Sequence, residues 1–221
     1  TMVISAGNEG VAGTFSSGAP GVSAGAITVA SVDNTDRRAP YATAAGREIA
    51  YGAATGSTAA VPTSGELELI SAGAPGTEAA QGCESSVVPP ATGAGQALLV
   101  ERGVCAFHLK ALAGQEAGYD AVILYNNAPG VVNPTVEGDP AITIPVVMIG
   151  QDDGLALQEA LTSGGVTWAW QEGAAVFENP TGGLVSDFSS YGLTAELQLK
   201  PDVAAPRSEE HTSELQSHTE I

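Results

Sequence analysis

The sequence has few basic residues and no long hydrophobic run. Only 7 of its 221 residues are Lys or Arg, against 25 Asp or Glu, which gives a formal net charge of −18. A chain of this charge has no basic patch with which to neutralise phosphates, so nucleic-acid binding is not expected. No stretch of about 18 apolar residues is present, and the sequence therefore predicts no membrane-spanning helix.

Histidine and cysteine are scarce as well. The chain has three histidines and two cysteines, and two of the histidines, His211 and His218, lie in the polar C-terminal segment. A structural zinc site needs four clustered ligands, so none is expected. Asp139, Asp152 and Asp153 lack the ligand spacing of a calcium loop. We expect no cofactor in this chain, although calcium remains possible in a longer parent protein.

Aromatic residues make up 5% of the chain, whereas glycine contributes 28 residues. Together with the abundant Ala and Val, this composition is typical of a compact, turn-rich α/β or β-rich protein. The length allows one large or two modest domains with an ample core.

One stretch near the N-terminus suggests a functional site. Residues 3–10 read Val-Ile-Ser-Ala-Gly-Asn-Glu-Gly, which predicts a buried parallel strand that stops at a tight turn with Asn8 at its carboxyl end. Open α/β sheets place their chemistry at that edge. An asparagine amide there can direct an N–H toward a developing negative charge. Taken alone, however, such an asparagine is more often a turn residue.

Three more motifs follow in order along the chain. Residues 27–34 read Ile-Thr-Val-Ala-Ser-Val-Asp-Asn, residues 186–192 read Ser-Asp-Phe-Ser-Ser-Tyr-Gly, and residues 199–206 read Leu-Lys-Pro-Asp-Val-Ala-Ala-Pro. With the Ala-Gly-Asn turn, these motifs resemble the subtilisin-like serine proteases (subtilases). The resemblance implies an α/β fold with a partial subtilisin-like parallel sheet. Leu193 stands where many subtilases have Pro.

The resemblance also assigns roles to the turn. It implies that the Asn8 side chain donates to the oxyanion of the tetrahedral intermediate, and that Ala6, Gly7 and Glu9 form part of the substrate pocket wall. Glu9 would favour basic substrate side chains there, or it is a solvated carboxylate at the rim.

A long insertion separates the Val-Asp turn from the Phe-Ser-Ser-Tyr-Gly motif. Such an insertion is tolerated at a surface turn when it folds by itself and its ends lie close together. The apolar pattern predicts two helices, with Leu109, Leu112, Ala113 and Ala117 on one face of the first and Asp152 or Asp153 as the cap of the second. The expected strands are 66–70, 97–103, 121–125 and 144–149, the expected helices are 106–117 and 154–161, and weaker strands are 48–51 and 167–170.

This order of elements, with Arg-Gly-Val-Cys-Ala-Phe at 102–107 and Leu-Tyr-Asn-Asn at 124–127, resembles the protease-associated (PA) domain over about residues 66–165. The resemblance implies a small inserted α/β domain that acts as a substrate-access or interaction lid.

The catalytic triad is not expected in this chain. His108 is the only histidine outside the tail, and no partner motif surrounds it. Ser189 and Ser190 match structural serines of the subtilase loop. The Asp and His segments would precede residue 1 and the Ser segment would follow Pro206, so the chain reads as an internal fragment that is inactive alone.

Cys83 and Cys105 are the only cysteines. In a secreted protein such a pair is more often bonded than free. A bridge between them would stabilise the fold by about 3 kcal/mol on the chain-entropy estimate.

The sequence thus predicts four segments: 1–36 as the first subtilase piece, 37–184 as the insertion, 185–206 as the second piece, and 207–221 as a tail. The tail resembles a translated sequencing adapter, with a natural polar tail as the alternative. The expected function is that of a secreted serine endopeptidase acting on polypeptides, outside nucleic-acid or membrane contexts. The alternative is a non-catalytic PA interaction module.

Overall fold

The computed structural model describes residues 2–129 and 132–207. The chain divides into two compact units, each of which is described by itself. The flanking unit consists of Thr1–Arg37 and Phe177–Ile221, and the inserted unit consists of Arg38–Val176. Most of the expected tail, residues 208–221, lies outside the described residues. Within the described residues, no helix is both long enough and apolar enough to cross a membrane.

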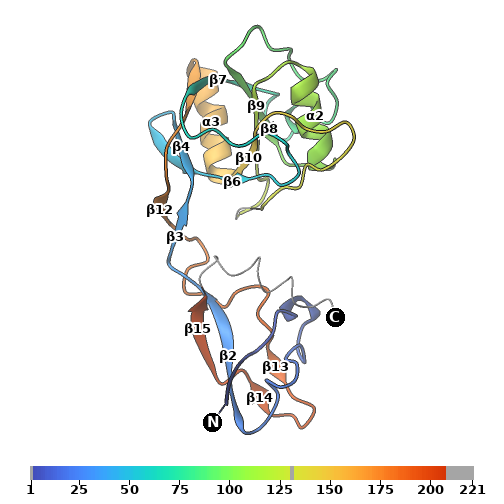
Figure 1. Cartoon of the computed structure of the whole chain (residues 1–221), viewed down its shortest axis with the longest axis vertical. Helices are drawn as coiled ribbons and strands as arrows, with labels where there is room; N and C mark the ends of the chain where they lie inside the picture. The colour runs from blue at the N-terminus through green and yellow to red at the C-terminus, as the bar shows by residue number, and fades with distance from the viewer. Residues whose placement is uncertain (1, 130–131, 208–221) are drawn as a thin grey trace. The chain divides into compact units, whose positions relative to one another are not determined.

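The flanking unit is built on a three-stranded parallel sheet in the order β1-β2-β15. Its strands are β1 (Met2–Ser5), β2 (Ala26–Asp33) and β15 (Val203–Arg207), so segments from both ends of the chain meet on β2 (Figure 1). A short 3₁₀ helix, η1 (Gly10–Ala12), follows β1. A second, antiparallel pair joins β13 (Gly192–Leu193) to β14 (Leu199–Lys200).

The prediction of a buried first strand is wrong in one respect. β1 does pair in parallel with β2, but Met2 and Val3 are 64% and 68% exposed. Val3 lies beside Ile27 in the register, and Ile27 is exposed too. Parallel strands become buried when helices cover both faces of their sheet, and the described part of this unit has no α-helix to do so.

The inserted unit contains an eight-stranded sheet in the order β5-β4-β11-β7-β8-β9-β10-β6. The four strands β7 to β10 are parallel, and the others are antiparallel to their neighbours. The strands are β4 (Tyr41–Ala44), β5 (Arg47–Ala50), β6 (Gly52–Ala53), β7 (Glu66–Ser71), β8 (Gln96–Glu101), β9 (Ala121–Tyr125), β10 (Val146–Ile149) and β11 (Val166–Trp170).

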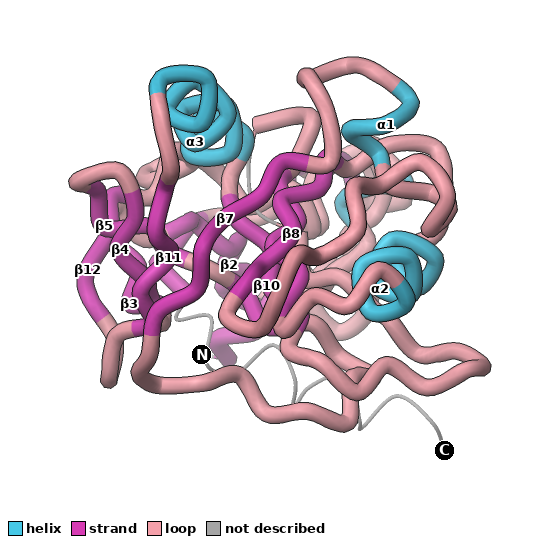
Figure 2. Tube along the Cα trace, turned by 90° about the horizontal axis from the view of Figure 1, so that it is seen from above, coloured by secondary structure: helices cyan, strands magenta, loops and turns pink. Residues whose placement is uncertain are grey.

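Helices cover both faces of this sheet. α2 (Phe107–Glu116) and α3 (Gln151–Ser163) lie on opposite sides of β7 to β10 in both Figure 1 and Figure 2. Leu157 of α3 belongs to one hydrophobic cluster with Trp168, and Ala111 of α2 belongs to the other with Val122. A short helix, α1 (Glu78–Gln81), precedes β8. Because both faces are covered, β9 and β10 are fully buried apolar strands.

Two details of the predicted helices are wrong. In α2, Leu109 is exposed, and the buried residues are Lys110, Ala111, Ala113 and Gly114. Small residues on that side let the helix approach the sheet closely, so they, rather than the leucine, face the core.

The predicted cap of the second helix is also wrong. α3 begins at Gln151 with Gly150 as its N-cap, so Asp152 and Asp153 lie inside the first turn. Acidic residues there are stabilised by the positive end of the helix dipole. Asp153 also pairs with Arg47 at 3.1 Å.

The two weaker expected strands, 48–51 and 167–170, are confirmed. β5 and β11 are members of the central sheet. β3 (Asp36–Ala39) and β12 (Ala175–Glu178) pair with each other where the chain leaves and re-enters the flanking unit.

Backbone bonds within the flanking unit join the two ends of the insertion. The N–H of Asp33 donates to the Leu184 carbonyl at 2.9 Å, and the N–H of Gly183 donates back to the Asp33 carbonyl at 2.9 Å. The N–H of Asn179 donates to the Thr35 carbonyl at 2.8 Å. The entry and exit of the insertion are therefore adjacent, which is the condition that a tolerated insertion requires.

Candidate functional site

The turn after β1 holds the residues that the sequence singles out. The N–H of Ala6 donates to the Val29 carbonyl of β2 at 2.9 Å, which extends the sheet pairing one residue beyond β1. Gly7 has a φ of 109°, a conformation that side chains rarely adopt, and glycine takes it without strain. After this reversal, Asn8 and Glu9 are exposed while Ala6 is buried. The turn thus presents Asn8 at the carboxyl edge of a parallel strand.

The motif of residues 186–192, Ser-Asp-Phe-Ser-Ser-Tyr-Gly, lies directly against this turn. The N–H of Ser190 donates to the Gly7 carbonyl at 3.0 Å, and the Ser190 Oγ accepts a 2.9 Å hydrogen bond from the N–H of Glu9. The N–H of Gly10 donates to the Phe188 carbonyl at 2.9 Å. Residues on both sides of Asn8 are therefore held by residues 188–190.

The loop of residues 186–190 is itself bonded to β2. The Ser189 Oγ accepts from the N–H of Ser31 at 3.0 Å, and the N–H of Ser186 donates to the Ser31 carbonyl at 3.0 Å. The Ser186 hydroxyl donates to an Asp33 carboxylate oxygen. Ser186 and Ser189 are 3% and 2% exposed. Their hydroxyls are thus used to hold the loop against the sheet.

The Lys-Pro-Asp motif anchors the last strand to the same sheet. Lys200 is buried, and its Nζ donates to the Ala26 carbonyl at 2.7 Å and to Asp202 at 2.6 Å. Asp202 also accepts from the N–H of Thr28 at 2.7 Å. The hydrogen bond from Lys200 lowers the pKa of the Asp202 carboxyl, and the bond from Thr28 acts in the same direction. The motif has a structural part here, since it fixes the start of β15 on β2.

The serine and histidine side chains do not form a triad within the described residues. Ser190 is fully buried and its Oγ is occupied by the N–H of Glu9, so it is not available as a nucleophile. His108 belongs to the inserted unit, where its Nε2 lies 2.9 Å from the Pro140 carbonyl. A triad requires its three groups to converge. The contacts of Ser190 and His108 instead give both residues a structural role.

The expected disulfide is present between Cys83 and Cys105, with a Cα–Cα distance of 5.9 Å. It links the end of α1 to the start of α2 within the inserted unit. Among the described residues, no group of three or more His, Cys, Asp or Glu side chains is placed to hold a metal ion.

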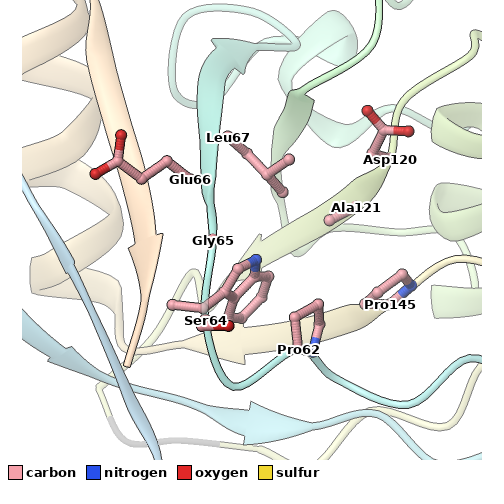
Figure 3. A pocket seen from close by; sticks show the side chains of 9 residues that line it. Pro62, Ser64, Gly65, Glu66, Leu67, Asp120, Ala121 and Pro145 are labelled. Carbon is pink, nitrogen blue, oxygen red and sulfur yellow. The ribbon is translucent and has the colours of Figure 1, made fainter. Parts of the chain in front are cut away.

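The inserted unit has a small pocket of about 160 Å³ (Figure 3). Glu66 and Leu67 point to opposite sides of β7, so the Glu66 carboxylate is directed away from the apolar side chains that line the pocket. The pocket lies near the first residues of β7 and β9, whereas open α/β sheets bind ligands at the carboxyl ends of their strands. It is lined by Pro62, Ser64, Gly65, Glu66, Leu67, Asp120, Ala121, Pro145 and Trp170.

A buried lysine in α2 interacts with the charge of Glu101, the last residue of β8. Lys110 in α2 has no exposed surface, and its Nζ donates to the Gln81 carbonyl at 2.5 Å. Burial lowers the pKa of Lys110 to about 8, against an opposing effect of the nearby Glu101 carboxylate. Sequence reasoning missed this residue, because the helix pattern placed Leu109 rather than Lys110 on the buried side.

The protein family described as the PA domain matches residues 63–157. The chain contains a PA domain. The match lies within the inserted unit and includes both cysteines, the buried β8 and β9, and the pocket-lining residues Ser64 to Pro145.

Three curated proteins with sequences similar to this chain are peptidases by name. The minor extracellular protease Vpr of Bacillus subtilis (strain 168) is 29% identical over 142 residues, which is 64% of this chain and 16% of that protein. The C5a peptidase of Streptococcus pyogenes serotype M18 is 33% identical over 115 residues, or 51% and 9%. The probable leucine aminopeptidase 2 of Arthroderma benhamiae is 35% identical over 100 residues, or 45% and 20%. The chain thus spans a fifth or less of these relatives.

Two solved structures are similar to part of the chain. The zinc aminopeptidase BSAP from Bacillus subtilis has a TM-score of 0.46 and 27% identity, covering 68% of this chain and 33% of that one. The aminopeptidase from Aneurinibacillus sp. strain AM-1 has a TM-score of 0.48 and 25% identity, covering 64% and 34%.

Proposed function

We propose that this chain is part of a secreted subtilisin-like serine endopeptidase with a PA domain inserted into its catalytic domain. Asn8 is the oxyanion donor, and Ala6, Gly7 and Glu9 line the pocket for the substrate residue that precedes the cleaved bond. The catalytic Ser, His and Asp belong to other segments of the parent protein. The described chain therefore supplies one part of the catalytic machinery and does not hydrolyse peptides by itself.

The observation that carries the proposal is the position of Asn8. It is exposed, lies three residues after the end of the parallel strand β1, and sits on a turn whose neighbouring backbone groups are bonded to Ser190, Phe188 and Val29. A donor fixed in this way needs no reorganisation when charge develops on a substrate oxygen. The name of the Vpr relative, a minor extracellular protease, supports a secreted peptidase, and its substrates by class are polypeptides.

The inserted PA unit is proposed to act as a substrate-access or interaction lid. Its net charge is negative, since 14 acidic residues face 4 basic ones among residues 38–176. A negatively charged unit attracts basic polypeptide segments and raises their rate of encounter at low ionic strength.

An aminopeptidase is the competing peptidase class, because the relatives include a probable leucine aminopeptidase. The serine class is preferred because residues outside the PA match hold the turn at Asn8 by hydrogen bonds. A serine protease uses such an asparagine as a hydrogen-bond donor to the oxyanion. A non-catalytic PA interaction module remains the second alternative, and it gives no role to that arrangement.

The test begins with the full-length parent protein. We expect it to hydrolyse peptides, to be inactivated by a covalent sulfonyl fluoride, and to keep its activity in 1,10-phenanthroline. Inactivation by the chelator alone would instead assign a metallopeptidase. Absence of hydrolysis in the secreted, folded protein would favour the interaction module.

Asn8→Ala in the same protein tests the assigned residue. Removing one oxyanion donor costs about 10²–10³-fold in kcat, a magnitude known from subtilisin, and KM should change little because the bond forms in the transition state. Asn133→Ala is the matched control, since Asn133 is an exposed asparagine in the inserted unit. An unchanged kcat in Asn8→Ala would contradict the role.

A further inference from the structure

We infer that Ser190 is a positioning residue for Asn8: its hydroxyl holds the turn that carries the oxyanion donor. This inference rests on the proposed function. Ser190 contacts no substrate, because it is fully buried, and so it acts through the turn rather than on the reacting atoms.

The two hydrogen bonds of Ser190 lie on either side of Asn8. Its N–H donates to the Gly7 carbonyl at 3.0 Å, and its Oγ accepts from the N–H of Glu9 at 2.9 Å. Asn8 is the one residue between these two contacts. Rotation of either peptide that flanks Asn8 would break one of the bonds, so both bonds together restrain the backbone at Asn8 and the direction in which its side chain leaves the turn.

Packing restricts the same turn. A Cβ added at Gly7 would lie 2.9 Å from the Ser190 Oγ, which shows how closely the serine approaches the backbone there. The Oγ of the neighbouring Ser189 instead accepts from the N–H of Ser31 in β2, so the two serine side chains bond different parts of the unit.

The bond from Glu9 to the Ser190 Oγ depends on a side chain. The bonds from Ala6 to Val29, from Gly10 to Phe188 and from Ser190 to Gly7 join backbone groups. A substitution at position 190 can therefore remove one restraint on the turn and leave the others. An oxyanion donor is useful only within hydrogen-bond distance of the charge, and a displacement of 1 Å costs about 10²-fold in rate.

The test uses the full-length parent protein and three variants: Ser190→Ala, Asn8→Ala and the double variant. We expect Ser190→Ala to lower kcat by about 10-fold, below the cost of a full 1 Å displacement, with KM nearly unchanged. In the Asn8→Ala background the same substitution should leave kcat unchanged, because the donor that it positions is gone. A purely structural role for Ser190 would lower kcat by the same factor in both backgrounds, and that result would overturn the inference.

Ser189→Ala is the matched control. Ser189 is also a buried serine whose Oγ accepts a backbone N–H, yet it bonds β2 rather than the turn. We expect it to lower the melting temperature about as much as Ser190→Ala does and to change kcat far less. Equal losses of kcat in the two variants would also overturn the inference.

The same measurements separate this inference from the proposed function. If Asn8→Ala has full activity, the proposed function fails. If Asn8→Ala is impaired and Ser190→Ala is not, the inference alone fails. Should Ser190→Ala not fold, Ser190→Cys keeps the shape of the side chain with a slightly larger atom and weakens the acceptor. It is then expected to lower kcat in the parent and not in the Asn8→Ala background.

Discussion

The side-chain amide of Asn179 donates a 2.9 Å hydrogen bond to the carbonyl of Asn34, a residue 145 positions earlier in the sequence. The Asn179 Oδ1 accepts from the hydroxyl of Thr181 at 3.1 Å. The bond to Asn34 closes the flanking unit where the PA-containing insertion leaves it and returns to it. The insertion can thus fold as its own unit without separating the strands on either side.

We expect Asn179→Ala to destabilise the flanking unit by about 1 kcal/mol, the net value of one buried or half-buried hydrogen bond. Urea denaturation of the chain, followed by proteolysis at sites within each unit, measures the effect on that unit. Asn133→Ala, at an exposed asparagine of the inserted unit, should leave the flanking unit unchanged. If the flanking unit is equally stable to urea in Asn179→Ala and in the unaltered chain, the backbone hydrogen bonds alone hold together the two ends of the insertion.

Loss of the disulfide should destabilise the inserted unit. Cys83 and Cys105 are 22 residues apart, and a cross-link of that length stabilises by about 3 kcal/mol on the chain-entropy estimate. We expect the Cys83→Ser, Cys105→Ser double variant to unfold at lower urea concentration, and the unaltered chain to match it when a reductant is added. The flanking unit has no cysteine and serves as the internal control. A reductant effect that persists in the double variant would assign the change to something other than the bridge.

The buried Lys110 should make the stability of the inserted unit depend on pH. Its pKa is lowered to about 8 in the folded state from an ordinary value of 10.5. Between these values the unfolded chain binds more protons than the folded one, so the free energy of unfolding rises with pH. The destabilisation is fully present below about pH 8.

The slope for one such group is at most about 1.4 kcal/mol per pH unit. Denaturation between pH 7.5 and 9.5 should detect it, before the tyrosines ionise. Their contribution has the opposite sign, because burial raises the pKa of Tyr51, Tyr119 and Tyr125. Lys110→Met should abolish the rise, and a rise that survives this substitution would exclude Lys110 as its source.

Gly114 is expected to be essential for the packing of α2 on the sheet. A Cβ at this position would lie 2.5 Å from Cγ2 of Val122 and 3.5 Å from Cδ2 of Leu98. Gly114→Ala gains about 1 kcal/mol of helix propensity, but overpacking in a core costs about 1–3 kcal/mol. We therefore expect a net loss of stability in chemical denaturation.

A double-mutant cycle with Val122→Ala separates the two effects. Val122→Ala alone removes buried methyl groups and should be destabilising. In its background, Gly114→Ala should be neutral or stabilising, because the space is open and only the helix propensity remains. If Gly114→Ala costs the same in both backgrounds, the contact with Val122 is not the cause.

The local pattern of the inserted unit could be predicted well. The buried run at 121–125 and the strand at 66–70 form β9 and β7, because both are short, and the first is rich in β-branched and aromatic residues while the second alternates apolar and polar residues. The disulfide was predicted from the presence of two cysteines in a chain that is expected to be secreted. The start of α3 was not predicted correctly, because Asp152 and Asp153 are favourable N-cap residue types, whereas the helix begins at Gln151 with Gly150 as its N-cap.

The candidate site was only half visible in the sequence. The Ala-Gly-Asn turn is contiguous, so Asn8 could be identified from its neighbours. The role of Ser190 could not be identified in this way, because it lies 181 positions after Glu9 and no local spacing encodes their contact. The exposure of β1 could not be predicted from the sequence either, because it depends on whether another layer of the fold covers the strand.

The sequence by itself determined where most of the strands and the two longer helices of the inserted unit form, but not α1, β4 or β6, and which asparagine follows the first parallel strand. These are consequences of side-chain periodicity and backbone preference over a few residues. Only the tertiary structure decided which faces are buried and that the loop of residues 186–190 holds the turn at Asn8. Such contacts form between residues far apart in the chain, and their free energy comes from closing the fold as a whole.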